Sequence, residues 1–286
     1  MELEFHELRK NYGKKEALKG VSMTLTEGVY GLLGPNGAGK STLMNILTGN
    51  LTATSGSITL DGADILALGK DFRKRLGYMP QQQTYYASFT AEQFLFYVAS
   101  LRGMDKHLAA QRIDELLEKV ELSDVRRKRL GGYSGGMRQR LLFAQAILDD
   151  PDILVLDEPS AGLDPKQRIT MRNLIGELAR NKIVIISTHV VSDVEYIGKE
   201  FLFLSDGEIC KSGSFAQLTG ALQGQVWEVE VRQDEIEQAS RCGLVCGESR
   251  KGENFLLRML AKETPPYPAY CVAPSMEDVY LNCFGA

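Results

Sequence analysis

Short runs of apolar residues alternate with helix-like patterns over the stretch from about residue 150 to residue 205. The runs at 153–156, 183–186 and 201–204 are rich in Ile, Val, Leu and Phe, which is typical of buried strands, and residues 166–180 carry a helical pattern. A similar run at 28–33 predicts one more strand near the start of the chain. Because helical connections join parallel strands, this order predicts an α/β fold with a largely parallel sheet.

The N-terminal part and the middle of the chain have different patterns. Alternating residues at 3–8, and a short apolar run at 58–60 between turn residues, predict additional strands. Residues 90–93 match a helix capping box, and apolar residues between 113 and 120 recur at helical spacing. We therefore expect a mostly helical subdomain over about residues 88–150.

The pattern changes again after about residue 220. Strict alternation over residues 227–231 predicts a half-exposed strand, and residues 275–278 are suited to cap a final short helix. The chain is therefore expected to comprise one large domain over residues 1–220 and a small α+β accessory domain over residues 221–286.

Composition and charge exclude several classes of protein. The 286 residues are 44% hydrophobic and 24% charged, with a formal net charge of −4, so no chain-wide attraction to nucleic acid is expected. No apolar run reaches the 18 residues that a membrane span needs, which predicts a cytoplasmic chain without a direct span. Five cysteines make no disulfide framework, and Cys242 and Cys246 have no histidine nearby to complete a metal site.

A complete phosphate-binding loop follows the predicted strand at 28–33 and precedes a helical pattern. Its glycines let successive backbone N–H groups face phosphates, Lys40 is suited to reach the β- and γ-phosphates, and the Ser41 hydroxyl is a ligand for Mg²⁺. This order of strand, loop and helix predicts a nucleotide-binding site. The loop and the residue after it are Gly34, Pro35, Asn36, Gly37, Ala38, Gly39, Lys40, Ser41 and Thr42.

Two carboxylates, Asp157 and Glu158, stand directly after the apolar run at 153–156. The carboxyl ends of parallel strands form the ligand-binding edge of such sheets, so this is a Walker B pattern. Asp157 is suited to hold Mg²⁺, and Glu158 is suited to polarise the water that attacks the γ-phosphate. The alternative for this pair alone is a solvated acidic turn at the end of a strand.

The segment at 133–140 lies between these two motifs and resembles the signature motif of ATP-binding cassette (ABC) proteins. In that family the Ser and Gly backbone groups at a helix start contact the γ-phosphate bound by the opposite subunit. The matching residues here are Ser134, Gly135 and Gly136. The segment departs from the commonest pattern at Tyr133, where Leu is usual, and at Met137, where Gln is usual; the phosphate-facing residues are retained.

The remaining cassette motifs occur in the family's order. Gln81 resembles the glutamine that touches Mg²⁺, residues 160–164 with Asp164 resemble the D-loop that crosses the dimer interface, His189 resembles the switch histidine, and Tyr12 resembles the aromatic that stacks on adenine. The resemblance covers about residues 1–220. It implies a P-loop NTPase core with an antiparallel N-terminal β subdomain, and catalytic roles for Glu158, His189 and Gln81. It also implies that Ser41, Gln81 and Asp157 hold Mg²⁺.

The resemblance further implies ATP and Mg²⁺ as cofactors, a second ABC subunit as partner, with a homodimer expected, and a separate transmembrane permease. The chain would then lie at the cytoplasmic face of the membrane. The tail around residues 273–280 resembles that of bacitracin-type exporters, which favours export of a drug, peptide or other amphipathic cargo. An ABC importer ATPase and a soluble ABC ATPase without a transport role stay open as alternatives.

Overall fold

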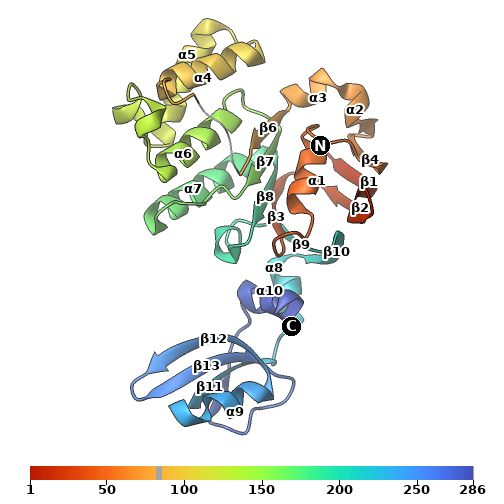
Figure 1. Ribbon diagram of the computed structural model, residues 1–286, viewed down its shortest axis with the longest axis vertical. Coiled ribbons are helices and arrows are strands. Elements are labelled where there is room, and N and C mark those ends of the chain that lie inside the picture. Colours follow the sequence, from red (N-terminus) through yellow and green to blue (C-terminus); the bar gives the residue numbers. More distant parts are fainter. Residues whose placement is uncertain (82–85, 286) are drawn as a thin grey trace.

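A six-stranded sheet forms the centre of the computed structural model, which describes residues 1–81 and 86–285 (Figure 1). Its order is β10-β9-β3-β8-β7-β6, and all neighbouring pairs are parallel except β10 with β9. The largely parallel α/β fold expected from the apolar runs is therefore confirmed. The strands are β3 (Gly28–Leu33), β6 (Leu76–Met79), β7 (Ile153–Asp157), β8 (Ile183–Thr188), β9 (Glu200–Ser205) and β10 (Glu208–Gly213).

Both faces of this sheet are covered, because successive side chains of a strand point to opposite sides. Leu154 and Leu156 of β7 pack into one core with the helical region, whereas Ile153 and Val155 pack into another with the N-terminal sheet. The helix α1 (Lys40–Leu47) contributes to the second core, and α7 (Pro165–Leu178) contributes to the first. The core strands thus read as continuous apolar runs.

The N-terminal sheet is antiparallel, with the order β2-β1-β4-β5. One of its strands, β2, was not expected from the sequence. Its buried residues Leu18, Val21 and Leu25 are spaced by three and four, because register shifts interrupt its pairing with β1, and this hides the alternation of a strand. The elements here are β1 (Leu3–Tyr12), β2 (Lys15–Leu25), β4 (Ser55–Leu60), β5 (Ala63–Asp64), α2 (Ile65–Leu68) and α3 (Lys70–Lys74).

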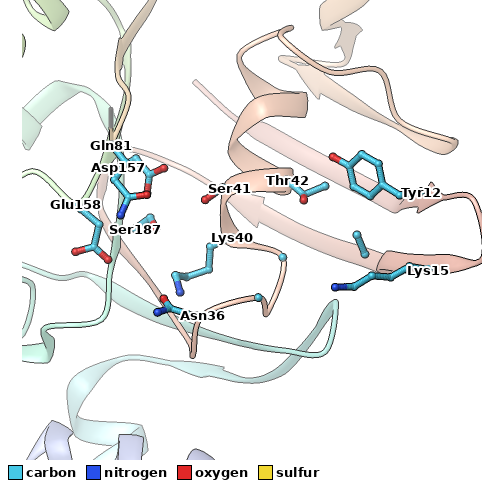
Figure 2. A pocket seen from close by; sticks show the side chains of 13 residues that line it. Tyr12, Lys15, Asn36, Lys40, Ser41, Thr42, Gln81, Asp157, Glu158 and Ser187 are labelled. Atoms are coloured by element: carbon cyan, nitrogen blue, oxygen red, sulfur yellow. The ribbon is translucent and has the colours of Figure 1, made fainter. Parts of the chain in front are cut away.

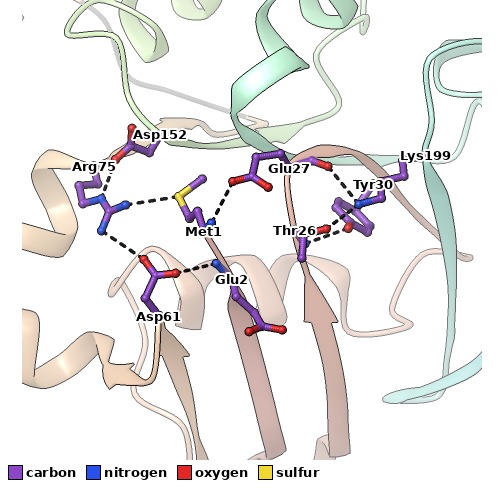
Figure 3. A network of polar contacts seen from close by, with 9 residues as sticks. All are labelled: Met1, Glu2, Thr26, Glu27, Tyr30, Asp61, Arg75, Asp152 and Lys199. Atoms are coloured by element: carbon purple, nitrogen blue, oxygen red, sulfur yellow. Dashed lines mark hydrogen bonds and ion pairs between the residues drawn. The ribbon is translucent and has the colours of Figure 1, made fainter.

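Polar contacts fasten the N-terminal sheet to the amino ends of the central strands (Figure 3). The Arg75 guanidinium lies 2.6 Å from the carboxylate of Asp152, which precedes β7, and 3.9 Å from that of Asp61, which follows β4. Lys199 donates hydrogen bonds to Thr26 Oγ1 at 2.5 Å and to the carbonyl of Glu27 at 3.1 Å. Since the phosphate-binding loop follows the carboxyl end of β3, these contacts lie at the opposite edge of the sheet.

The middle of the chain is helical, as expected, with α4 (Ala91–Arg102), α5 (Lys106–Lys119) and α6 (Gly135–Ala146). Thr90 and Gln93 form the capping box that the sequence predicts at the start of α4. Among the described residues, no helix is both long and apolar enough to span a membrane.

The C-terminal part contains a third, antiparallel sheet with the order β12-β13-β11-β14. It follows α8, and α10 returns to the cassette after it (Figure 1). The boundary predicted at residues 220 and 221 falls at the end of α8; a separate domain there stays a prediction. The elements are α8 (Phe215–Gly220), β11 (Val226–Val231), α9 (Ile236–Ala239), β12 (Leu244–Lys251), β13 (Asn254–Leu260), β14 (Ala269–Cys271) and α10 (Met276–Phe284).

A buried ion pair joins α10 to the C-terminal sheet. The Asp278 carboxylate is 1% exposed and accepts hydrogen bonds from Arg258 at 2.6 and 2.9 Å and from Ser275, which caps α10. Burial alone raises the pKa of Asp278, but the hydrogen bonds from Arg258 and Ser275 outweigh it, so the pKa lies below its ordinary value. The pair therefore stabilises the fold above the ordinary aspartate pKa and loses that contribution as the pH falls through the depressed value.

We expect Arg258→Met to lower the free energy of unfolding of the C-terminal part by about 3 kcal/mol at pH 7, since it leaves a buried charge unpaired. The difference from the unmutated chain should shrink as the pH falls through the depressed pKa of Asp278. Trp227, the single tryptophan, lies in β11 beside β13 and reports urea unfolding of this sheet by fluorescence. The exposed pair of Arg241 with Glu237 supplies the control Arg241→Met, which should change stability far less; equal losses in both variants would contradict this account.

Candidate nucleotide-binding site

The phosphate-binding loop connects β3 to α1 with backbone geometry that demands glycine. A Cβ added to Gly34 would lie 2.2 Å from the carbonyl oxygen of Leu204. Gly39, at the N-cap of α1, has a backbone φ of 110°, which residues other than glycine rarely adopt. The loop therefore passes close to β9 and delivers the free N–H groups of α1 to the carboxyl edge of the sheet, where an anion is stabilised.

A cavity of about 240 Å³ opens between the start of α1 and the ends of β7 and β8 (Figure 2). Tyr12 and Lys15 border it from the strands β1 and β2, on the far side of α1 from Asp157 and Glu158. The structure thus gathers most of the expected site residues around one space. Its lining comprises Tyr12, Lys15, Ala17, Asn36, Gly37, Gly39, Lys40, Ser41, Thr42, Gln81, Asp157, Glu158 and Ser187.

Lys40 is held inside the loop by its own backbone. Its Nζ donates hydrogen bonds to the carbonyl oxygens of Gly34 at 2.5 Å and of Pro35 at 3.0 Å, and the residue is only 8% exposed. Burial lowers the pKa of Lys40, while the negative charges of Glu158 and Asp157 oppose that shift. A buried ammonium with neutral carbonyl partners favours an anionic ligand within its reach.

Asp157 ends β7 as a buried carboxylate. Burial raises the pKa of Asp157, and the charge of Glu158 adds to this effect; the nearby hydroxyls of Ser187 and Ser41 and the charge of Lys40 act in the opposite direction. The buried Oγ of Ser187 has no hydrogen-bond partner of normal geometry in the described part of the chain. A polar ligand at this edge would satisfy that hydroxyl.

The residues at this edge fit Mg²⁺, because they offer the hard oxygen ligands that it prefers. These are the Asp157 carboxylate, the Ser41 hydroxyl and the Gln81 amide, all lining the cavity. Over residues 1–81 and 86–285, no group of three or more His, Cys, Asp or Glu side chains is arranged to hold a metal. A cation here would therefore depend on one carboxylate together with hydroxyl, amide, water and phosphate oxygens, as is usual for Mg²⁺ at nucleotide sites.

Glu158 points away from Asp157 and contacts His189. Its φ of 52° is unusual for a side-chain-bearing residue and turns the chain sharply after β7. Glu158 Oε1 lies 2.7 Å from His189 Nδ1 and 3.2 Å from the backbone N of His189, and Thr188 Oγ1 lies 3.4 Å from Oε2. Because a carboxylate only accepts hydrogen bonds, this contact places a proton on Nδ1 of His189.

The backbone of Glu158 is fixed as firmly as its side chain. Its N–H donates to the Ser187 carbonyl at 2.8 Å, and its carbonyl accepts a hydrogen bond at 2.7 Å from Nε2 of the buried Gln139 on α6. Sequence reasoning missed both Gln139 and Ser187. Ser187 could have been found, since it directly follows an apolar run that ends at the same sheet edge, whereas Gln139 lies inside the signature segment but its position there does not indicate a contact with Glu158.

The signature residues do not line this cavity. Ser134 is the N-cap of α6 and accepts a hydrogen bond from the N–H of Met137 at 3.2 Å; Ser134 and Gly135 are exposed, while Gly136 is buried beside Gln167 and Leu163. They therefore form an exposed helix N-terminus of the kind that binds anions.

The two departures in the signature segment are explained by packing. Tyr133 is buried in the helical region, and its hydroxyl donates to the carbonyl of Val125 at 2.8 Å. Met137 is half-buried and packs against the same core. Neither side chain replaces the exposed groups of Ser134 and Gly135.

Asp164 is exposed and serves within this chain as the N-cap of α7, accepting a hydrogen bond from the N–H of Gln167 at 2.8 Å. Ser160, four residues before Asp164, donates a hydrogen bond from its hydroxyl to the carboxylate of Asp193, which lies four residues after His189. The segment 160–164, which was predicted to be a D-loop, and the histidine segment are thus in direct contact.

Comparison with known proteins places the chain in one family. A family profile described as ABC transporter matches residues 18–161. The chain is 40% identical over 232 residues to YxlF of Bacillus subtilis, an uncharacterized ABC transporter ATP-binding protein, covering 81% of this chain and 77% of that protein. It is 36% identical over 214 residues to Nod factor export ATP-binding protein I of Burkholderia orbicola, covering 74% and 70%.

A further relative is the linearmycin resistance ATP-binding protein LnrL of Bacillus subtilis, 33% identical over 227 residues, with coverage of 78% and 72%. Among solved structures, an ATP-binding subunit of an ABC transporter superposes with a TM-score of 0.71 at 25% identity, covering 77% of this chain and 93% of that one. The dimer of MJ0796, a bacterial ABC transporter cassette, gives 0.69 at 25% identity, with coverage of 74% and 98%.

The chain therefore belongs to the ABC transporter family. Within that family it is an ATP-binding subunit, as its relatives and its P-loop fold agree. ATP hydrolysis is the activity of this class, and the MJ0796 cassette has also been solved with ADP and Pi in a post-hydrolysis state.

Proposed function

We propose that the chain hydrolyses ATP as the energy-supplying subunit of an ABC exporter whose membrane channel is a separate permease. The observation that carries the hydrolytic part is the cavity that combines Lys40 of the phosphate loop with Asp157 and Glu158 at the sheet edge. Export is supported by the names of two relatives, one a Nod factor export protein and the other a linearmycin resistance protein. The proposed cargo is a drug, a peptide or another amphipathic molecule.

The phosphate chain of ATP would lie along the loop, with backbone N–H groups from Gly37 to Thr42 and Asn36 around it. On binding, Lys40 would exchange its two carbonyl partners for the β- and γ-phosphate oxygens. Ser41, Asp157 and Gln81 would hold Mg²⁺, which neutralises the phosphate charge and orients the γ-phosphate. Tyr12, half exposed at the rim, would stack on adenine.

Glu158 is proposed as the general base. Its carboxylate would take a proton from the attacking water, the water oxygen would form a bond to the γ-phosphorus, and the bond from that phosphorus to the bridging oxygen of ADP would break. His189 holds the Glu158 carboxylate through Nδ1, and its exposed ring is available to the γ-phosphate. The unusual φ of Glu158 supports this role, because strained backbone concentrates at functional sites.

Two copies of the chain would complete the site. Ser134, Gly135 and Gly136 do not line the cavity of their own chain and lie at the N-terminus of α6, with Ser134 and Gly135 exposed, so we propose that they bind the γ-phosphate of a second copy. Asp164 would lie near the interface of that homodimer. The dimeric state of the MJ0796 cassette supports this arrangement.

We also propose that the dimer docks on the permease at the cytoplasmic face of the membrane. The test is to identify a membrane protein that co-purifies with the chain and to reconstitute the complex in liposomes. With ATP outside, where the cassettes face, an exporter should accumulate its cargo inside the vesicles. Cargo that leaves the vesicles instead would establish an importer, and ATPase activity with no membrane partner would favour a soluble ABC ATPase.

Replacing Tyr12 tests the adenine contact. We expect Tyr12→Ala to weaken ATP binding by about 1–2 kcal/mol, or roughly fivefold to thirtyfold in Kd, because it removes a stacking surface. Tyr12→Phe keeps the ring and should bind as the unmutated chain does. Binding can be measured by calorimetry with ATP and with inorganic triphosphate; loss of triphosphate affinity in Tyr12→Ala would contradict the adenine assignment.

A further inference from the structure

The C-terminal helix α10 packs against the segment that carries His189. This segment leaves β8 at Thr188 and continues through His189 into a short 3-10 helix, η4 (Val191–Asp193). Val191 and Val194 of the segment share a core cluster with Met276 and Val279 of α10, and both α10 residues are fully buried. The helix α10 and the segment that carries His189, about 85 residues apart in the sequence, are thus packed together next to a residue proposed to act in hydrolysis.

A polar contact fixes the register of this packing. Glu195 Oε1 accepts a hydrogen bond at 3.2 Å from the backbone N–H of Met276, the first residue of α10. A carboxylate at a helix N-terminus is favoured both by the free N–H group and by the helix dipole. Glu195 is itself tied to η4, because its N–H donates to the carbonyl of Val191 at 3.1 Å.

The far end of α10 is seated on the central sheet. The Phe284 ring lies 6.0 Å from that of Phe203 in β9, and Tyr280 contacts Phe284 with ring centroids 4.8 Å apart. Burial raises the pKa of Tyr280, and the negative charge of Glu158 adds to that shift. The helix therefore spans from Glu195, beside the histidine segment, to Phe203 of β9.

We propose that α10 is a positioning element of the hydrolytic site. Through Met276 and Glu195 it holds the segment after β8 in place, and it thereby fixes the contact of His189 with Glu158. The Arg258–Asp278 pair ties the start of α10 to β13, so the C-terminal sheet is mechanically connected to the histidine segment. This inference rests on the proposed function only for its effect on turnover, since the packing of α10 on the histidine segment is itself part of the structure.

The test uses the full chain with Glu195→Ala, which removes the acceptor for the Met276 N–H without touching ATP or Glu158. We expect kcat to fall about tenfold with the KM for ATP nearly unchanged, because the base loses its orientation while the binding residues stay in place. The control is Glu277→Ala, which removes an exposed carboxylate from the same turn of α10 and should leave kcat unchanged.

Imidazole NMR of the ligand-free chain separates positioning from general loss of stability. The chain has three histidines, His6, His107 and His189, so the His189 signal can be assigned with His189→Ala. We expect the His189 signal to shift in Glu195→Ala while those of His6 and His107 stay in place. Glu195→Asp, which keeps the charge but shortens its reach, should shift the same signal and provides the test should Glu195→Ala not fold.

An unmoved His189 signal would overturn the inference, whether kcat falls or not. So would a shift in Glu195→Ala accompanied by unchanged kcat in a chain that hydrolyses ATP. A correctly folded chain without any ATPase activity would instead overturn the proposed function, and the NMR comparison would still test the coupling of α10 to His189.

Discussion

Glu158→Gln is expected to reduce kcat for ATP hydrolysis by about 10²- to 10⁴-fold, the usual contribution of a general base. The amide keeps the size of the carboxylate and can accept a hydrogen bond from His189, but it cannot take a proton from water. ATP binding should persist, because Lys40 and the phosphate loop are unchanged. The variant should therefore accumulate as an ATP-bound dimer.

Steady-state phosphate release measures the first effect, and retention of labelled ATP after gel filtration measures the second. Glu208→Gln, which removes an exposed carboxylate from β10 outside the cavity, is the control and should retain full turnover. Turnover within tenfold of the unmutated chain in Glu158→Gln would remove Glu158 as the base.

Lys40→Ala should have the second large effect, on binding itself. A charge-assisted hydrogen bond to phosphate contributes about 1.5–3 kcal/mol, so we expect Kd for ATP to rise about tenfold to a hundredfold. Hydrolysis should fall further, because the developing charge on the γ-phosphate loses its cation. Calorimetric titration with ATP in the presence of Mg²⁺ measures the change.

The same substitution removes the donor that satisfies the carbonyls of Gly34 and Pro35, so the loop could be disturbed for a reason unrelated to phosphate. Thermal unfolding of the ligand-free variant checks this point. Lys14→Ala, at an exposed position in the turn between β1 and β2, is the matched control and should bind ATP normally. Unchanged ATP affinity in a folded Lys40→Ala chain would show that the loop assignment is wrong.

The central sheet was predictable because its strands are buried on both faces and read as continuous apolar runs. The runs at 153–156 and 183–186 became β7 and β8 almost residue for residue. The caps of α4 and α10 were also predictable, since Thr90 and Ser275 act on residues only three positions away. Local chemistry of this kind is visible in a single sequence.

Features that depend on distant pairing were not predictable in the same way. The strand β2 was missed because bulges in its pairing with β1 break the period of two. The contact of Glu158 with His189 joins residues 31 positions apart, and the hydrogen bond from Gln139 to Glu158 joins two different motifs. The site residues were therefore identified as separate motifs, whereas their mutual geometry required the fold.

The same distinction explains the signature segment. The sequence marks Tyr133 as a departure from the family pattern, and the structure shows that its ring and hydroxyl are used to pack the helical region. The exposed groups of Ser134 and Gly135 are independent of that packing. Their expected ligand is the γ-phosphate bound by another copy of the chain.

Sedimentation of the Glu158→Gln chain, alone and with Gly135→Asp added, determines whether two copies share the bound ATP. A Cβ added at Gly135 meets no atom within 4 Å, and an acidic residue is tolerated in the first turn of a helix, so the second substitution should repel phosphate without unfolding α6. We expect Glu158→Gln to be monomeric without nucleotide and dimeric with ATP and Mg²⁺, and Gly135→Asp to abolish the dimer while each chain still binds ATP. A monomer at saturating ATP, or a dimer that Gly135→Asp leaves intact, would contradict this expectation.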